Sequence, residues 1–131
     1  MLDHRIISTA IAAPYEVVYG FLSRPENMPK WAEGLGHSFD RVEDSLWRVA
    51  TPMGSMLVRF TPRNAFGIVD HWVIPDGGEA MYNPMRVVAH GEGTVVAFTL
   101  FRRADMDDEK FAADAAWVTK DLAKLKALLE A

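Results

Sequence analysis

The sequence predicts an α+β domain, and two patterns lead to that prediction. Between residues 37 and 102, hydrophobic and polar residues alternate and are interrupted by turn residues, which is typical of antiparallel strands. From residue 107 to the end, hydrophobic residues recur at helical spacing. The predicted order is therefore one strand, two short helices, six strands and one long helix.

The first strand is predicted in HRIISTAIAA, residues 4–13, and it ends before Pro14. Proline suits the first turn of a helix, because its missing N–H costs nothing there, and hydrophobic residues at helical spacing follow over 17–22. The pattern SRPE at 23–26 indicates a second helix start. Pro29 limits this second helix to one or two turns.

Six strands are predicted in the middle of the chain. The turns between them are EDS, TPMG, PRNA, PDGGE and HGEG. Because these turns are too short for a crossover connection, neighbouring strands must be antiparallel. The predicted strands span residues 37–42, 46–51, 55–61, 67–74, 80–89 and 94–102.

The last part of the chain predicts one continuous helix of about 24 residues. Its start, ADMDDE at 104–109, is acidic, which suits the partial positive charge of a helix N-terminus. Spacings of three and four residues then place six hydrophobic residues on one face of the helix. These residues are Phe111, Ala115, Val118, Leu122, Leu125 and Leu129.

The composition fits one globular domain over residues 1–131. Half of the residues are hydrophobic and 24% are charged, so a chain of this length can bury a sizeable core. There is no cysteine, which excludes disulfides and sulfur-ligated metals. The four histidines are scattered without metal-site spacing, so we expect neither a metal nor another cofactor.

The charge and hydropathy of the chain also bear on its partners and location. A net charge of −4 and the lack of a basic run argue against a nucleic-acid partner. No segment approaches the ~18–20 hydrophobic residues of a membrane span, so no membrane partner is expected. The first residues, MLDHRIISTAIAAP, resemble a secretion signal only in their AIAA end. We therefore expect a cytoplasmic protein.

Counting outward from the predicted turns indicates which strand residues share a face. If Gly77 and Gly78 form a two-residue turn, Trp72 lies opposite Asn83, and Asp70 lies opposite Met85. The neighbouring turns pair Val49 with Met56, Trp47 with Val58, Met85 with Phe98 and Val87 with Val96. One face collects mostly hydrophobic residues and should face the core and the long helix. Its members are Trp47, Val49, Met56, Val58, Phe60, Ile68, Trp72, Ile74, Met81, Met85, Val87, Val96, Phe98 and Leu100.

Asp70 and His71 are neighbours inside GIVDHWVIP, residues 67–75, and a strand turns adjacent side chains to opposite faces. The predicted register puts Asp70 on the inner face beside Asn83, and it puts His71 on the outer face, which favours a structural role over a functional one. A carboxylate among hydrophobic residues is costly unless it is hydrogen-bonded, and burial raises its pKa. Asp70 is then either a structural residue, bonded to Asn83, a backbone N–H or a buried water, or a functional one. As a functional residue it would anchor a ligand or act as a general acid/base.

Tryptophan and methionine residues on the inner face suit an adaptable hydrophobic pocket, although each of them singly is explained by packing. Trp117 lies beside the main stripe of the last helix, where it either lines the mouth of a cavity or covers the end strand. His37 shares a strand face with Phe39, as either a structural edge residue or a ligand contact. Asp70 is the candidate catalytic residue. The candidate ligand-binding residues are Trp31, His37, Trp47, Met56, Asp70, Trp72, Asn83, Met85, Phe98 and Trp117.

The stretch IAAPYEVVYGFLSRPENMPKWAEGL, residues 11–35, resembles the START-related, or SRPBCC, superfamily. In that superfamily a first strand ends in a run of the form xAPxEVxxxFLxDPxNxPxW, and Arg24 stands here where an acidic residue is common. WRVATPMG, and the segment from TVVAFTLFR into the last helix, look like later strands and the helix of the same superfamily. The matching positions are Ala13-Pro14, Glu16-Val17, Phe21-Leu22, Pro25, Asn27, Pro29 and Trp31.

This resemblance implies a helix-grip fold of the order β-α-α-β6-α, in which a curved antiparallel seven-stranded sheet wraps around a long C-terminal helix. It also implies a deep cavity between sheet and helix, used across the superfamily for sterols, lipids, polyketides, plant hormones and aromatic compounds. Some members are polyketide aromatase/cyclases or oxygenase domains, and others bind or carry ligands or activate a chaperone.

Three functions are consistent with these observations. The first is binding of a small hydrophobic or aromatic molecule in the cavity, with Asp70 and Asn83 orienting it. The second is an enzyme of the polyketide cyclase or dehydratase type, in which Asp70 transfers a proton next to a carbonyl that Asn83 polarises. The third is a protein-interaction module. Val69, Val73 and Val88, predicted on the outer face, leave room for a homodimer patch.

Overall fold

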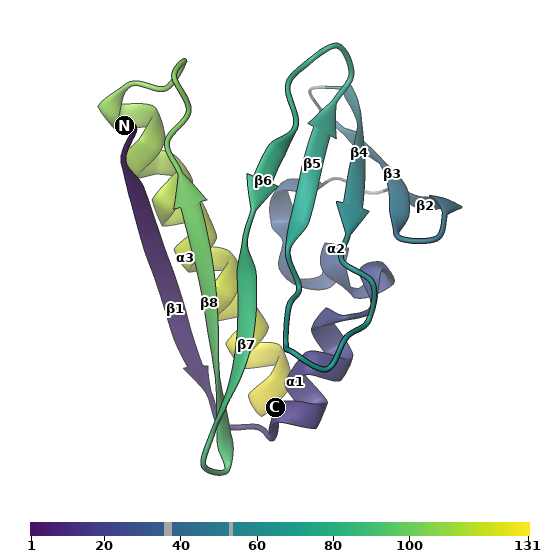
Figure 1. The fold of residues 1–131 in the computed structure, drawn as a ribbon, viewed down its shortest axis with the longest axis vertical. Coiled ribbons are helices and arrows are strands. Elements are labelled where there is room, and N and C mark those ends of the chain that lie inside the picture. Colours follow the sequence, from purple (N-terminus) through teal and green to yellow (C-terminus); the bar gives the residue numbers. More distant parts are fainter. Residues whose placement is uncertain (36–37, 53) are drawn as a thin grey trace.

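A computed structural model describes residues 1–35, 38–52 and 54–131 of the chain (Figure 1). The α+β class, the antiparallel strands and the long C-terminal helix are confirmed, but the structure has eight strands and not seven. The strands are β1 (His4–Ile11), β2 (Ser38–Glu43), β3 (Leu46–Thr51), β4 (Gly54–Phe60), β5 (His71–Pro75), β6 (Met81–Asn83), β7 (Met85–His90) and β8 (Gly93–Phe101). The helices are α1 (Tyr15–Leu22), α2 (Met28–Trp31) and α3 (Asp108–Glu130), with the short 3-10 helices η1 (Pro25–Asn27) and η2 (Glu33–Leu35).

The strands of the described residues form two antiparallel sheets, not the single seven-stranded sheet that the sequence predicts. Their orders are β1-β8-β7 and β2-β3-β4-β5-β6. The eighth strand arises at Pro84, which divides the predicted strand 80–89 because proline has no N–H for the ladder. The chain nevertheless runs directly from β6 into β7, and the N–H of Thr99 donates to the Pro84 carbonyl at 2.9 Å. The chain therefore links the two sheets directly at this point (Figure 1).

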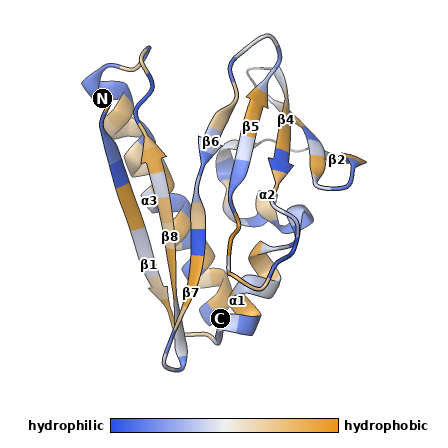
Figure 2. Ribbon diagram, viewed as in Figure 1, coloured by the Kyte–Doolittle hydropathy of each residue, from blue (hydrophilic) through white to orange (hydrophobic). Residues whose placement is uncertain are grey.

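Helix α3 runs along the three-stranded sheet, and both of its ends are held. Asp107 caps the N-terminus by accepting a hydrogen bond from the N–H of Lys110 at 2.7 Å. Near the C-terminus, Lys126 donates to the carbonyl of Ala10 in β1 at 2.5 Å. Hydrophobic and hydrophilic residues alternate around the helix (Figure 2). The buried members of the predicted stripe are Phe111, Ala115, Leu122 and Leu125.

The short helices between β1 and β2 connect α3 to the five-stranded sheet. Pro14 is the N-cap residue of α1, which agrees with a helix start at this proline. Helix α2 contacts α3, and η2 contacts β3. Glu33 in η2 also pairs with Lys120 at 3.2 Å and with Lys124 at 3.1 Å, both on α3. This segment therefore lies between the long helix and the sheet.

The predicted pairing of the segment 67–75 is wrong by one residue. In the structure, His71 is opposite Asn83, and Val73 is opposite Met81. The connection is longer than a two-residue turn, because residues 76–80 all lie outside the strands. The turn is closed by the N–H of Gly78, which donates to the Pro75 carbonyl at 3.2 Å. Since side chains alternate along a strand, a shift of one residue turns every side chain of the segment to the other face.

The other predicted pairs are confirmed. Val49 pairs with Met56 and Trp47 with Val58, and across β7 and β8 Met85 pairs with Phe98 and Val87 with Val96. The inner face is therefore the predicted one, except that the segment 67–75 contributes its other set of side chains. Val69 and Val73 are consequently buried, which removes them from the predicted outer patch, and Val88 is 55% exposed.

Candidate functional site

A cavity of about 180 Å³ lies between the segment 28–34, strands β5, β6 and β8, and helix α3. Most of its lining is apolar and buried, and besides the indole N–H groups of two tryptophans it carries three polar side chains: His71, Asn83 and Asp121. Apolar walls with a few convergent polar groups are characteristic of small-molecule sites. The other lining residues are Met28, Trp31, Ala32, Gly34, Val73, Phe98, Trp117 and Val118.

His71 is a buried wall of this cavity because of the one-residue shift in β5. Its ring lies 6.3 Å from the ring of Phe60 and 6.0 Å from that of Phe98, measured between centroids. Its Nδ1 is 3.4 Å from the carbonyl oxygen of Val69. Burial lowers the pKa of His71 to about 4, so the imidazole is neutral at physiological pH.

Asp121 enters the cavity from α3 and is only 8% exposed. It lies three residues after Val118 and four before Leu125, so helical spacing puts it on the inward face. Its Oδ1 accepts a hydrogen bond from the N–H of Glu33 at 3.4 Å. Burial raises the pKa of Asp121 to about 6, against the weaker effects of the Glu33 hydrogen bond and of Lys120 and Lys124.

Two tryptophans line the cavity at different depths. Trp31 is buried, and Trp117 is 47% exposed, which places it at the mouth. A Cβ added to Gly34 would lie 3.2 Å from the indole Nε1 of Trp117, so the missing side chain lets the helix approach closely. The ammonium of Lys120 lies 5.4 Å from the Trp117 ring centroid.

Asp70 does not face this cavity, and the prediction that it does is wrong. Its carboxylate accepts hydrogen bonds from the Tyr82 hydroxyl at 2.8 Å, from the Met85 N–H at 2.8 Å, and from the Arg86 guanidinium at 2.9 and 3.1 Å. Burial alone would raise the pKa of Asp70, but Arg86, the Met85 N–H and Tyr82 together lower it. Asp70 is thus an ionised carboxylate held on the outer side of the sheet.

The predicted ligand-binding residues divide into several groups. Trp31, Asn83, Phe98 and Trp117 meet at the cavity. Met56 and Met85 lie on the inner face and pack in or against the core. Trp72 lies on the outer face instead, where it stacks on Tyr82 at a centroid distance of 5.0 Å. His37 lies outside the described residues.

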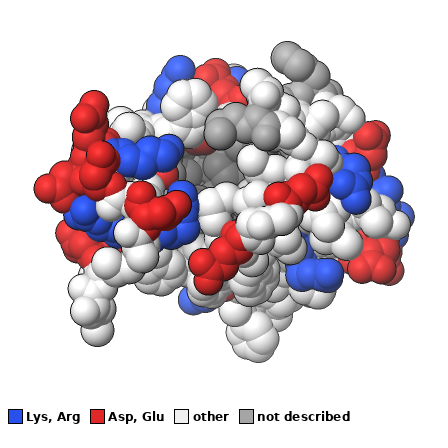
Figure 3. Space-filling view, turned by 90° about the horizontal axis from the view of Figure 1, so that it is seen from above, with Lys and Arg blue, Asp and Glu red and all other residues white. Residues whose placement is uncertain are grey.

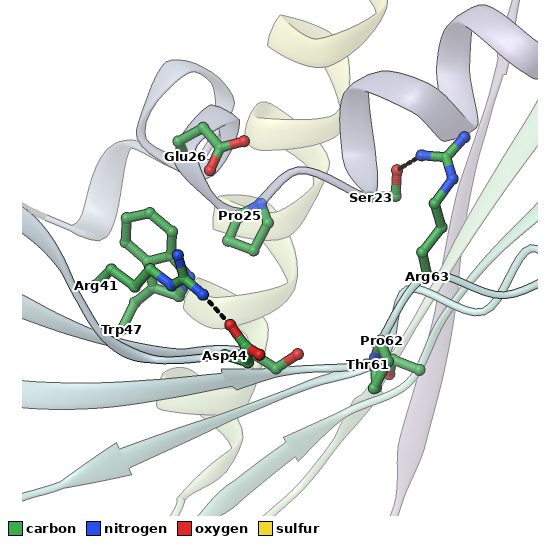
Figure 4. A pocket seen from close by; sticks show the side chains of 10 residues that line it. Ser23, Pro25, Glu26, Arg41, Asp44, Trp47, Thr61, Pro62 and Arg63 are labelled. Atoms are coloured by element: carbon green, nitrogen blue, oxygen red, sulfur yellow. Dashed lines mark hydrogen bonds and ion pairs between the residues drawn. The ribbon is translucent and has the colours of Figure 1, made fainter.

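Trp47 lines a different hollow, a groove of about 530 Å³ beside the β2–β3 hairpin. Figure 4 shows Arg41 with Asp44 on one side of this groove, Ser23 with Arg63 on the other, and Pro25 between them. Arg41 is paired with Asp44, and Arg63 donates to the Ser23 hydroxyl at 2.9 Å. None of the ten residues that line this groove is buried. We therefore take the smaller, buried cavity as the candidate site.

Neither the charge on the surface in view nor the described helices point to a large charged partner or a membrane span. In the view from above, acidic and basic side chains are interspersed, and in this view no broad surface has a single sign (Figure 3). Among the described residues, no helix combines the length and the hydrophobicity needed to cross a membrane.

Sequence reasoning missed His71 and Asp121 as cavity residues. The signal for Asp121 was available, because it shares a helix face with Val118 and Leu125 of the hydrophobic stripe. The signal for His71 was not, because its orientation depends on a turn whose length the sequence leaves open.

Comparisons with known proteins identify the fold. No protein-family model and no curated protein matches the chain. Solved structures do. An uncharacterized protein from Bacillus thuringiensis has a TM-score of 0.77 at 15% identity, with 97% of this chain and 98% of that chain covered. Ara h 8.0201 has a TM-score of 0.73 at 12% identity, with 98% of each chain covered.

A third similar structure is the Aha1 dimer from Colwellia psychrerythraea, with a TM-score of 0.73, 17% identity and coverage of 98% of this chain and 97% of that chain. At these identities the likeness concerns the fold alone, and it is consistent with a helix-grip fold.

Proposed function

We propose that this protein binds a small hydrophobic or aromatic molecule in the cavity between the five-stranded sheet and α3. The observation that supports this proposal is the convergence of His71, Asn83 and Asp121 on a cavity whose other walls are apolar. Polar groups in such a place orient a ligand, and the apolar walls supply the affinity.

The size of the cavity narrows the kind of molecule. A dry apolar cavity of about 150 Å³ is large enough for benzene. The cavity here, of about 180 Å³, therefore suits one aromatic ring with a small substituent. A larger ligand would extend past Trp117, which is half exposed at the mouth.

The fold likeness supports the same proposal. The structural neighbours include Ara h 8.0201 and DynU16, a protein of the dynemicin biosynthetic locus, of which this chain covers 47% at a TM-score of 0.71. These two neighbours suggest that proteins of this fold bind ligands. The acid/base role considered for Asp70 is not part of the proposal, because the Asp70 carboxylate is bonded to Arg86 and Tyr82 on the outer side of the sheet.

Toluene is a suitable probe, and the indole N–H signals of the protein are a suitable readout. The chain has four tryptophans, which give four such signals in a ¹⁵N-labelled sample. We expect toluene to shift the signals of Trp31 and Trp117 and to leave that of Trp72 in place, because only the first two line the cavity.

The substitution Val118→Phe should fill the cavity and abolish these shifts. Val17→Phe, the same change at a 49% exposed position of α1, serves as the control and should leave them intact. Toluene shifts that survive Val118→Phe, or that include Trp72 as strongly as Trp31, would contradict the proposal.

A further inference from the structure

Two of the side chains that line the cavity, His71 and Asp121, offer hydrogen-bond acceptors, and this has a consequence for the ligand that rests on the function proposed above. None of the described lining residues is Lys or Arg. Besides two tryptophan indoles, the side chains with hydrogen-bonding groups are an imidazole, a carboxylate and an amide, from His71, Asp121 and Asn83.

The tautomer of His71 follows from its one hydrogen bond. The Nδ1 atom faces the carbonyl oxygen of Val69, which can only accept, so Nδ1 bears the proton. In a neutral imidazole the other nitrogen is then an acceptor. Nε2 is therefore a bare acceptor on a side chain that is only 5% exposed.

This Nε2 is open to the cavity and has no partner within the described residues. Within the described part of the chain, the one hydrogen bond of the His71 ring is the one through Nδ1. Among the described residues, however, no fully buried side-chain nitrogen or oxygen lacks a partner. An unpartnered Nε2 must therefore reach free space, and the space that His71 lines is the cavity.

Asp121 supplies a second acceptor. Its Oδ1 takes the N–H of Glu33, which leaves Oδ2 without a partner within the described chain. Its charge also matters, because an anionic ligand in a buried site would meet a carboxylate without a balancing lysine or arginine among the described lining residues. Lys120 and Lys124 of α3 do not line the cavity, and both are paired with Glu33.

We propose that the cavity selects a neutral single-ring aromatic molecule bearing a hydrogen-bond donor, a phenol or an arylamine, which donates to Nε2 of His71 with Asp121 as the neighbouring acceptor. Aryl carboxylates should bind more weakly, because the Asp121 carboxylate repels their charge. This proposal deepens the proposed function, because it names the chemical class of the ligand for the same site.

The experiment compares three probes of one shape: toluene, 4-methylphenol and 4-methylbenzoate. Their dissociation constants are measured at pH 7.5 from the shifts of the Trp31 and Trp117 indole signals. One hydrogen bond to an otherwise unpartnered acceptor should make 4-methylphenol bind about tenfold more tightly than toluene. We expect 4-methylbenzoate to bind more weakly than toluene.

The outcomes separate this inference from the proposed function. If toluene and 4-methylphenol bind equally, or if 4-methylbenzoate binds most tightly, the donor selection is wrong and the cavity still binds aromatic molecules. If none of the three probes shifts the two indole signals, both proposals fail.

Two variants assign the selectivity to its residues. His71→Phe removes the acceptor and keeps an aromatic ring, so the preference for 4-methylphenol over toluene should fall to about one while toluene still binds. Asp121→Asn should strengthen binding of 4-methylbenzoate relative to toluene. Asp114→Asn, on the same helix and paired with Lys110 at 2.8 Å, is the control and should change neither ratio.

A direct measurement keeps the proposal testable if His71→Phe fails to fold. In the wild-type protein, the ¹⁵N signal of His71 Nε2 should shift on addition of 4-methylphenol and stay in place with toluene. An unchanged signal at saturating 4-methylphenol, or an unchanged preference in His71→Phe, would overturn the assignment of His71.

Discussion

At the scale of single residues, the adjacent Asp70 and His71 show how one backbone step separates two roles. The strand turns them to opposite faces, as alternation requires, but each takes the face predicted for the other. Asp70 becomes the centre of a hydrogen-bonded cluster with Tyr82 and Arg86. His71 becomes a neutral acceptor inside the cavity.

The substitution Asp70→Asn should reduce the free energy of unfolding by about 2 kcal/mol. The reason is that the carboxylate accepts from Tyr82, the Met85 N–H and Arg86 in a place that is only 5% exposed. Urea denaturation at pH 7 measures the change, with Asp76→Asn in an exposed loop as the control. We expect toluene to shift the Trp31 signal of Asp70→Asn as in the wild type. Loss of that shift in a folded variant would mean that Asp70 acts at the cavity after all.

At the scale of elements, the decisive feature is the connection between β5 and β6. The two glycines of PDGGE suggest a two-residue turn, but Gly77 has a φ of 70° in a turn that starts at Pro75, and the loop extends to residue 80. That extra length shifts the register of the whole segment 67–75 by one residue. Upstream of β5, the N–H of Val69 donates to the Met85 carbonyl and the N–H of Val87 donates to the Gly67 carbonyl, which holds this shifted register.

A pair of glycine substitutions tests how closely this segment approaches β7. Gly67 has a φ of 70° and Gly91 a φ of 58°, so an added Cβ strains the backbone similarly at both. At Gly67 that Cβ would also overlap the carbonyl oxygen of Val87, whereas at Gly91 it meets nothing within 4 Å. We expect Gly91→Ala to reduce the free energy of unfolding by about 1 kcal/mol and Gly67→Ala by at least about 2 kcal/mol more. If thermal or urea unfolding shows that both substitutions reduce the free energy of unfolding equally, Gly67 does not lie close to β7.

At the scale of the whole molecule, two titratable groups line the cavity, and they make the stability of the protein depend on pH in opposite directions. The pKa of His71 falls from 6.5 to about 4 on folding, so its contribution is complete above pH 6.5 and is lost as the pH falls toward 4. The pKa of Asp121 rises from 3.8 to about 6, so the folded state holds its proton more tightly, and stability is lost as the pH rises toward 6. Between pH 4.5 and 6 the two slopes oppose each other.

Removing either group should therefore expose the slope of the other. When the pH is raised from 4.5 to 6.0, the free energy of unfolding of Asp121→Asn should rise by about 2 kcal/mol more than that of the wild type. Over the same interval, the free energy of unfolding of His71→Phe should fall by about 2 kcal/mol relative to that of the wild type. Urea unfolding at the two pH values measures both differences. If a variant shows the same pH dependence as the wild type, the pKa of the substituted group does not change on folding.

Much of the fold could be predicted because its signals are local. The hydrophobic stripe of α3, the acidic residues before it and the pairs Trp47–Val58 and Met85–Phe98 depend on spacings of a few residues, and all of them agree with the structure. Part of the candidate site could be predicted for the same reason. The sequence predicts that Trp31, Asn83, Phe98 and Trp117 line a common cavity, and all four do.

The sequence by itself determined the α+β class, the apolar faces of α3, β3, β4, β7 and β8, and four of the cavity walls, because helical and strand periodicity are properties of neighbouring residues. Only the tertiary structure decided that His71 and Asp121, and not Asp70, are the ionisable groups of the cavity. The physical reason is that strand register depends on the length of a loop and on hydrogen bonds to a distant strand, such as those between Val69 and Met85. A shift of one residue in that register turns each inward-facing side chain of the segment outward, and each outward-facing one inward.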